Sequence, residues 1–191
     1  MNTFDAIATR RSIRKFKAAP VPDELLQKVL KAATLAPSGK NRQPWRLVVV
    51  RGERRREMMR VMREGLANSK AQGRELGSAE NSARVMEQAP LTVFVFNPDG
   101  RRPWLEHSLD QMFWDVVDIQ SVGAAIQNML LAAQDLGLGS LWICDVFSAY
   151  EELCNWLGES GELIAAVALG YADESPSARP RKPLGEVVRE A

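Results

Sequence analysis

The stretch from Phe113 to Leu136 constrains the fold of this chain most, because it keeps a helical pattern over its whole length. One stripe along it is apolar and consists of Ile119, Val122, Ile126, Met129 and Ala133. A second stripe carries small residues, namely Ser121, Ala125, Asn128 and Ala132. A helix that is apolar on two faces is buried, and small side chains let another helix approach closely. We therefore predict a central helix, with a dimer contact along it.

The rest of the chain alternates between predicted helices and strands within a single domain that covers residues 1–191. A sizeable core is expected, because 46% of the 191 residues are hydrophobic. Helical patterns cover residues 4–8, 23–36, 53–64, 83–88 and 148–157, and buried-strand patterns cover 47–50, 91–96, 140–144 and 163–169. Residues 65–82, rich in Gly, Ser and Asn, are predicted to be mobile. Residues 101–111 show no clear periodicity and are predicted to form a lid or substrate loop.

A polar decamer, Ala36 to Trp45, joins one of these helices to one of these strands. Pro37 and Pro44 fix the backbone and donate no hydrogen bond, so they end the helix and set the direction of the strand. Between them lie five hydrogen-bonding side chains, those of Ser38, Lys40, Asn41, Arg42 and Gln43. This composition suits a loop that grips a polar, planar ligand. An ordinary polar surface loop fits the same residues.

Basic residues gather in two further segments near the two ends of the chain. In the heptad from Arg10 to Phe16, three arginines and Ser12 can converge on one phosphate, because guanidinium groups chelate oxyanions. A basic helix terminus explains the same heptad. The proline-rich tail, residues 176–183, carries Arg179, Arg181 and Lys182. It could be solvated, close over an anion or reach a partner chain.

The distribution of charge argues against a nucleic-acid partner. Residues 1–70 hold 17 Lys and Arg against 6 Asp and Glu, whereas residues 71–178 hold 4 against 16. The basic part lacks interleaved aromatic residues, and the arginines at 54–63 fit the solvated side of a helix. A small anionic ligand explains the remaining basic residues. The acidic middle would also give a neighbouring subunit something to pair with.

Other sequence features point to a cytoplasmic protein without metal or acid–base catalytic motifs. The N-terminus has no apolar run behind basic residues, and no window approaches the length of a membrane span. Cys144 and Cys154 have neither redox nor metal spacing, so we predict buried thiols. His107, the only histidine, has no nucleophile or acid at a telling spacing, which favours a surface or lid role.

Five short motifs together resemble the FMN-dependent nitroreductase family, and the resemblance covers the whole chain. They are Arg10-Arg11-Ser12-x-Arg14, Pro37-Ser38-Gly39-x-Asn41-x-Gln43-Pro44-Trp45, Gly137-Leu138-Gly139-Ser140-x-Trp142, Gly170-Tyr171 and Arg181-Lys182-Pro183-Leu184. The glycines at 137–139 follow a helix and precede a strand, which is the reverse of a dinucleotide-binding fingerprint. Each motif is weak alone, but their order and separations are hard to obtain by chance.

The resemblance implies an α+β fold with a mixed, mostly antiparallel sheet flanked by helices, in a homodimer that binds FMN at the subunit interface. Arg10, Ser12, Arg14 and Arg181 would hold the phosphate, and Arg11 would lie near the ribityl chain. Pro37, Ser38 and Gly39 would cover the flavin of the other subunit, while Asn41 and Gln43 would address the polar edge of the ring. The backbone of Trp142, Ile143 and Cys144 would line the isoalloxazine, with Gly137 and Gly139 allowing close approach.

The implied activity is electron transfer from NADH or NADPH through flavin N5 to a small oxidised acceptor, such as a nitroaromatic or a quinone, in two half-reactions. The cofactor supplies this chemistry, which explains why no acid–base pair or nucleophile stands out. Reductive dehalogenation of halophenols is an alternative, because the Pro-Ser-Gly form resembles the iodotyrosine deiodinase branch. That branch is expected to bring Glu, Tyr and Lys from a lid, and residues 65–89 contain no Tyr. A flavin-binding protein without turnover is the third hypothesis.

Overall fold

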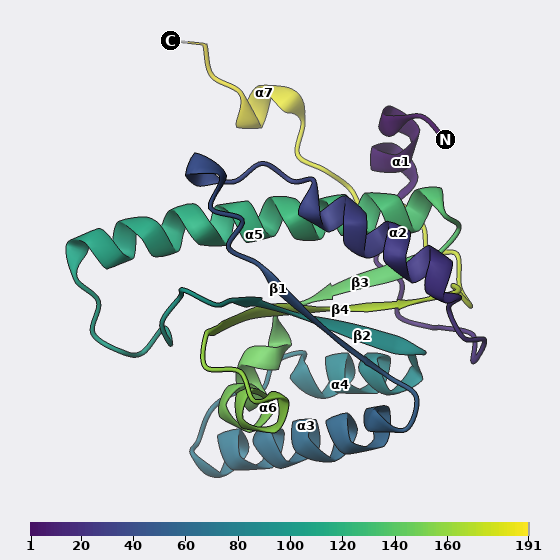
Figure 1. The fold of residues 1–191 in the computed structure, drawn as a ribbon. Coiled ribbons are helices and arrows are strands. Elements are labelled where there is room, and N and C mark those ends of the chain that lie inside the picture. The colour runs from purple at the N-terminus through teal and green to yellow at the C-terminus, as the bar shows by residue number, and fades with distance from the viewer. Residues whose placement is uncertain (191) are drawn as a thin grey trace.

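In a computed structural model, which describes residues 1–190, the centre of the fold is one four-stranded antiparallel sheet (Figure 1). Its strands are β1 (Arg46–Arg51), β2 (Leu91–Asn97), β3 (Gly139–Ile143) and β4 (Glu162–Gly170), in the order β1-β2-β4-β3. All seven residues of β2 are buried, as expected for a central strand in a continuous apolar run. The strand pairs are all antiparallel, consistent with the predicted mostly antiparallel sheet, and an isolated parallel bridge joins Ser12 to Ser140 outside the four strands.

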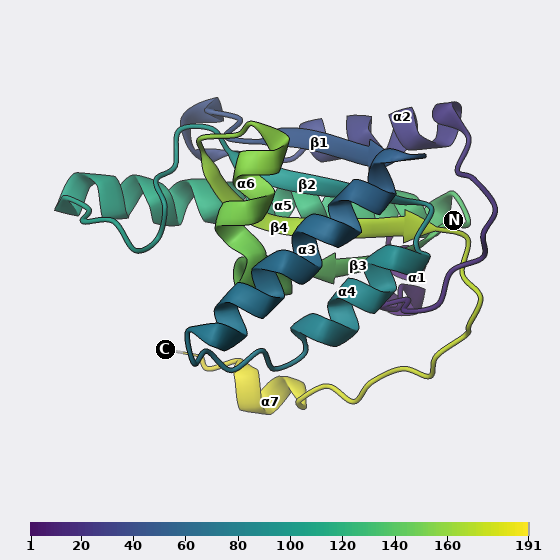
Figure 2. The same cartoon turned by 90° about the horizontal axis from the view of Figure 1, so that it is seen from below.

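Helices cover both faces of this sheet (Figures 1 and 2). The helices are α1 (Thr3–Thr9), α2 (Asp23–Thr34), α3 (Arg54–Ala71), α4 (Ala79–Gln88), α5 (Leu109–Asp135), α6 (Tyr150–Leu157) and the short α7 (Leu184–Val187), with 3-10 turns η1 (Gly39–Asn41) and η2 (Asp145–Ala149). On one face, α2 and α5 pack over a core that includes Val93, Val167 and Ile126. On the other face, α3, α4 and α6 pack over Phe94, Phe96 and their neighbours.

The predicted central helix is α5, and it is longer than expected because it begins at Leu109. The hydroxyl oxygen of Ser108 accepts a hydrogen bond from the Gln111 backbone N–H at 3.2 Å and caps its first turn. Residues 122, 126, 129 and 133 of the apolar stripe are buried, whereas Ile119 is 41% exposed. By length and composition alone α5 could cross a membrane, contrary to our prediction. In this fold its second half is a core helix against the sheet and α2.

The segment 65–82 is not a mobile loop, and this prediction was wrong. Helix α3 continues through it to Ala71 and α4 begins at Ala79. A Cβ on Gly65 would lie 2.4 Å from the Cβ of Ala149, so this glycine permits close packing of α3 on η2. The polar residues make tertiary hydrogen bonds: Ser69 donates to the Ser148 carbonyl at 2.7 Å, and Asn68 donates to Glu152 at 2.7 Å.

The two cysteines are free thiols, but only one is buried. Cys154 belongs to α6 and is 1% exposed in the core, where burial raises its pKa to about 11. Cys144 is exposed directly after β3, so the prediction that it is buried was wrong. A strand end at the edge of a sheet leaves the following residue open to solvent, which the apolar run through Ile143 did not reveal.

Candidate functional site

The arginines predicted to hold a phosphate line one cleft of about 540 Å³, although they come from the two ends of the chain. Arg10, Arg11, Ser12 and Arg14 form one wall, and the extended tail from Pro176 to Arg181 forms the other. Helix α1 ends at Thr9, so Arg10 lies where the chain leaves the helix. The N–H of Ile13 then donates to the Ser140 carbonyl at 3.0 Å, which ties this heptad to β3.

The guanidinium groups of this arginine cleft form no ion pair within residues 1–190, although the Glu174 carboxylate beside the cleft accepts hydrogen bonds from the backbone N–H groups of Arg14 and Lys15. Within residues 1–190, no carboxylate oxygen lies within 4.0 Å of a guanidinium nitrogen of Arg10, Arg11, Arg14 or Arg181. Burial, then the neighbouring charges of Arg181 and Arg11, lowers the pKa of Arg10. Arg10, Arg11 and Arg181 are crowded together and have no ion-pair partner among residues 1–190. This arrangement suits an oxyanion with more than one charge.

The two predicted glycines lie beside this cleft, at the start of β3. Gly137 and Gly139 line an adjoining recess of about 220 Å³, together with Arg11 and Pro176. Gly137 has a φ of +75° and ends α5 in the left-handed conformation. A Cβ on Gly139 would lie 2.9 Å from Ile13, so glycine at this position lets the Arg10 to Phe16 heptad run against the strand.

From this recess, β3 leads to the residues predicted to line a flavin ring. The Trp142 ring lies near Gly123 of α5 and is 37% exposed, whereas the Ile143 side chain is buried on the other face of the sheet. Backbone groups alternate along a strand, and the Ser140 carbonyl points to the outer edge of the sheet. The backbone groups of Trp142 therefore face the same open edge, where a ligand can reach them. Cys144 lies beyond β3 in a helical conformation, and its carbonyl accepts a hydrogen bond from the Phe147 N–H at 3.1 Å.

The decamer Ala36 to Trp45 is docked on α5. The Gly39 N–H donates to the Ser121 hydroxyl oxygen at 3.2 Å, and a Cβ on Gly39 would lie 2.3 Å from the Val117 Cγ1. Within the loop, the Gln43 N–H donates to the Ser38 hydroxyl oxygen at 3.0 Å. Pro37, Asn41 and Gln43 are exposed. The predicted polar residues are thus held on a fixed frame and face solvent.

From the sequence, Arg42 is one of five side chains that could grip a ligand, but in the structure it contacts α5 and makes the only ion pairs of the decamer within residues 1–190. Its Nε and Nη2 atoms donate to the two carboxylate oxygens of Asp118, each at 3.1 Å. Asp118 is 2% exposed, and the guanidinium lies 4.7 Å from the centroid of the Trp114 ring. An acidic residue within a largely apolar helical pattern was the available signal, because a buried carboxylate requires a partner.

The arginine cleft and the decamer lie at opposite ends of the molecule in both views (Figures 1 and 2). Helix α5 connects them, since Ser121 contacts the decamer and Gln134 lines the recess beside the cleft. These two residues are about 20 Å apart along the helix axis. The predicted residues therefore form two groups within one chain, with Trp142 between them.

The loop predicted to be a lid, residues 101–111, is fixed by more contacts than its sequence indicated. His107 has an acidic partner after all: its Nδ1 atom lies 2.6 Å from an Asp115 carboxylate oxygen, and its Nε2 atom lies 3.1 Å from the Arg102 carbonyl. Arg102 pairs with Glu151 of α6, and Trp104 packs edge-on against Tyr150 at a centroid distance of 4.7 Å. Contacts of this kind between a loop and distant helices produce no regular spacing of residues in the sequence, so they could not be predicted from it.

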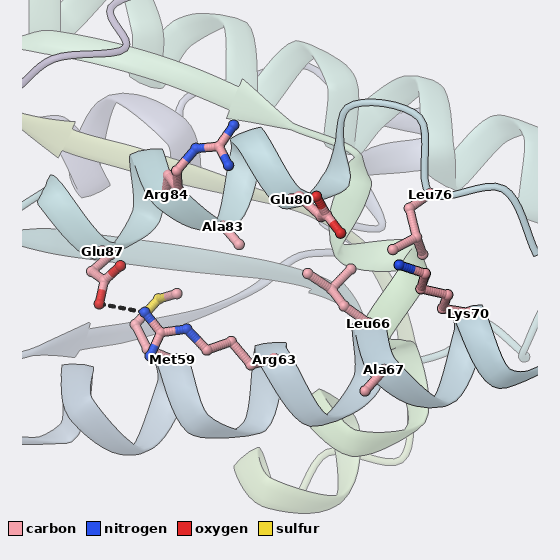
Figure 3. Close-up of a pocket in the computed structure, with 10 residues that line it drawn as sticks. All are labelled: Met59, Arg63, Leu66, Ala67, Lys70, Leu76, Glu80, Ala83, Arg84 and Glu87. Carbon is pink, nitrogen blue, oxygen red and sulfur yellow. Dashed lines mark hydrogen bonds and ion pairs between the residues drawn. The ribbon is translucent and has the colours of Figure 1, made fainter.

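A separate groove of about 370 Å³ lies between α3 and α4, on the face of the sheet opposite α5 (Figure 3). Met59, Leu66 and Ala83 form its apolar floor, and the ion pair of Arg63 with Glu87 at 2.6 Å crosses one end. It contains no residue that the sequence analysis assigned to a site. The groove follows the line along which these two neighbouring helices pack against each other.

Comparison with known proteins identifies relatives over nearly the whole chain. The NADPH-flavin oxidoreductase of Vibrio harveyi is 30% identical over 200 residues, which cover 99% of this chain and 73% of that protein. The structure of the NADPH:FMN oxidoreductase from Vibrio harveyi complexed with NAD+ superposes with a TM-score of 0.77 at 25% identity and covers 100% of this chain and 77% of that chain. The structure of a BluB-like flavoprotein from Clostridium difficile 630 superposes with a TM-score of 0.77 at 28% identity, and the match covers 100% of this chain and 99% of that chain.

A family model gives the same assignment as these relatives. The model described as the Nitroreductase family matches residues 7–171, which include α2, α5 and all four strands. The match begins just before the arginine heptad and ends at Tyr171, so the tail that completes the cleft lies beyond it. The resemblance drawn from five short motifs is confirmed, and this chain belongs to the Nitroreductase family.

Proposed function

We propose that this protein is an FMN-dependent oxidoreductase that takes electrons from NADH or NADPH and passes them to a small oxidised acceptor. The observation that carries the proposal is the arginine cleft, which gathers cations from both ends of the chain. Within residues 1–190 these guanidinium groups donate only to backbone carbonyls and form no ion pair. A phosphate monoester matches this charge, and the open edge of β3 beside it can receive a planar ring. The relatives named above are flavin proteins or flavin oxidoreductases.

The residues of the cleft fit the phosphate end of FMN. Arg10, Arg14 and Arg181 would bind its oxygens, Ser12 would add a hydroxyl, and Arg11 would lie near the ribityl chain. Gly137 and Gly139 would let the cofactor approach the sheet, and the backbone of Trp142, Ile143 and Cys144 would lie along the ring. Bound FMN would supply the acceptance of hydride at N5 and the transfer of electrons onward.

The second group of predicted residues would act across a homodimer. Pro37, Ser38 and Gly39 lie far from the arginine cleft of their own chain, so in this proposal they cover the flavin of a second copy. Asn41 and Gln43 would instead contribute hydrogen bonds to the polar edge of the flavin ring of their own chain. The first half of α5 exposes Leu109, Met112, Phe113, Val116 and Ile119, which recur at helical spacing. This apolar stripe is suited to burial against another copy of the chain.

The reaction would proceed in two half-reactions at one face of the ring. NAD(P)H would bind, deliver hydride and leave before a nitroaromatic or quinone binds in the same place. The protein would contribute position and exclusion of water, with loop 101–111 as one wall. A cytoplasmic location is part of the proposal.

Absorbance spectroscopy on the purified protein tests the proposal directly. We expect a flavin spectrum after reconstitution with FMN, bleaching by NADH or NADPH without oxygen, and recovery on adding a nitroaromatic or quinone. Halophenols belong in the same panel, because recovery with halide release would favour the dehalogenase alternative. Flavin that binds but is not bleached by either nucleotide would support a protein without turnover. A protein that cannot be reconstituted with FMN contradicts the proposal.

A further inference from the structure

We propose that Arg42, through its paired contact with Asp118, is the positioning residue that holds the decamer in its flavin-facing conformation. This inference rests on the proposed function, since it concerns the loop that would meet the flavin. Arg42 would not touch the cofactor. It would set the backbone geometry of Ser38, Gly39, Asn41 and Gln43, and these four residues would contact the flavin.

The decamer needs such an anchor because its backbone is strained. Lys40, Asn41 and Gln43 all have positive φ angles, of 50°, 54° and 52°. Residues other than glycine rarely adopt this left-handed conformation, because the Cβ approaches the neighbouring carbonyl. Three such residues within four positions persist only where the surrounding structure fixes them, and strain of this kind collects at ligand-binding segments.

Arg42 lies between these strained residues and supplies the only ionic contacts of the decamer within residues 1–190. Its planar guanidinium makes two parallel hydrogen bonds of 3.1 Å to the Asp118 carboxylate and lies 3.7 Å from Asp99. These contacts raise the pKa of Arg42, with the hydrogen bond to Asp118 as the largest cause. A two-pronged contact fixes direction as well as distance, which a single charge does not.

The other contacts between the decamer and α5 follow the same face of the helix. Trp114, Val117, Asp118 and Ser121 recur at helical spacing. The Arg42 guanidinium contacts Trp114 and Asp118, Gly39 packs against Val117, and the Gly39 N–H donates to Ser121. The contact at Ser121 is one neutral hydrogen bond of 3.2 Å, and the contact at Val117 is steric. Asp118 is therefore the main attachment point, and its burial makes loss of Arg42 costly because an unpaired carboxylate would remain.

The decisive experiment compares FMN affinity in wild type, Arg42→Met, Arg42→Lys and Arg51→Met by fluorescence titration. Arg51 pairs with Asp23 at the other end of β1, is exposed, and serves as the matched control. We expect Arg42→Met to weaken FMN binding about tenfold, as for a loop that is competent one-tenth of the time. Arg42→Lys would not restore affinity, because lysine cannot make the paired contact. Arg51→Met would bind as wild type does.

A double variant, Arg42→Met/Asp118→Leu, separates positioning from stability. It removes the buried charge together with its partner, so the thermal midpoint is expected to return toward that of wild type. FMN affinity would remain weak, and the visible circular dichroism of the bound flavin would stay altered. Full recovery of affinity in the double variant, or wild-type affinity in Arg42→Met, overturns the inference. Failure of wild type itself to bind FMN overturns the proposed function instead.

Discussion

At the scale of single residues, the arginines differ in whether a carboxylate lies close enough to form an ion pair. The arginines of α3 have partners, for example Arg60 with Glu64 at 3.4 Å and Arg63 with Glu87 at 2.6 Å. The arginines of the cleft have no carboxylate partner among the described residues, and the pKa of Arg10 is lowered by burial and by the neighbouring charges of Arg181 and Arg11. Unpaired, crowded arginines mark a ligand site better than basic composition does.

Replacement of Arg181 by alanine is expected to weaken FMN binding about tenfold or more, since it removes a charge-assisted hydrogen bond to the phosphate. The fold should be unchanged, because the side chain is exposed and donates only to the carbonyls of residues 179 and 180. Lys182→Ala is the control, as Lys182 neighbours Arg181 but does not line the cleft. Equal affinities for the two variants would refute the assignment of Arg181.

His107 provides a prediction about pH. Both of its ring nitrogens face acceptors, the Arg102 carbonyl and the Asp115 carboxylate, so the doubly protonated ring satisfies both. These hydrogen bonds, that to the Arg102 carbonyl first, raise the pKa of His107 above its ordinary value of 6.5. A raised pKa means that the contact stabilises the loop fully below pH 6.5 and loses this effect as the pH rises through the higher value.

We therefore expect hydrogen exchange of residues 101–108 to accelerate with rising pH beyond the chemical rate. The effect should vanish in His107→Gln. Because the chain has one histidine, its imidazole resonance gives the pKa without assignment. In Asp115→Asn that pKa should fall. The titration of Glu162 must be fitted with it, because burial raises the pKa of Glu162 to about 7 and its charge interacts with His107. A pKa at or below 6.5 in wild type would contradict the prediction.

At the scale of elements, periodicity predicted the strands and the central helix well, because apolar spacing reports burial. The prediction failed where glycine, serine or asparagine, which are common in turns, is used inside a helix to pack against another element. Gly65 indicated a break but allows α3 to touch η2, and the serines and asparagines after it bond to other elements. The motif predicted that the arginines of the two chain ends would converge, and they line one cleft. The contact of Arg42 with Asp118 depends on how the decamer lies on α5, which no local pattern encodes.

The contact of the decamer with α5 gives an element-scale prediction. Gly39→Ala is expected to displace the loop, because the new Cβ would lie 2.3 Å from the Val117 side chain, and to weaken FMN binding severalfold. A second substitution, Val117→Ala, removes the obstructing atoms and should restore most of the affinity. Gly185→Ala in α7 meets nothing within 4 Å and serves as the control. If the Val117→Ala change gives no recovery, the clash is not the cause.

At the scale of the whole molecule, the exposed apolar stripe on α5 predicts self-association that is coupled to cofactor binding. Phe113 is 60% exposed, and Phe113→Lys would place a charge within the stripe. Analytical ultracentrifugation is expected to show a shift from dimer to monomer, together with loss of bound FMN on dilution. Leu35→Lys, at a site 69% exposed outside α5, is the control. A monomeric wild type that keeps its flavin would contradict the coupling.

The cleft between Arg10 and Arg181 has one more consequence, for the topology of the chain. A phosphate held by both residues would act as a reversible cross-link between positions 171 residues apart, and would convert an open chain into a closed ring. Like a disulfide, such a link lowers the entropy of partly unfolded states that keep both contacts, and long loops gain most from it. Bound cofactor would then protect the C-terminal tail against proteases. Cleavage of the tail would indicate that the phosphate no longer links it to Arg10.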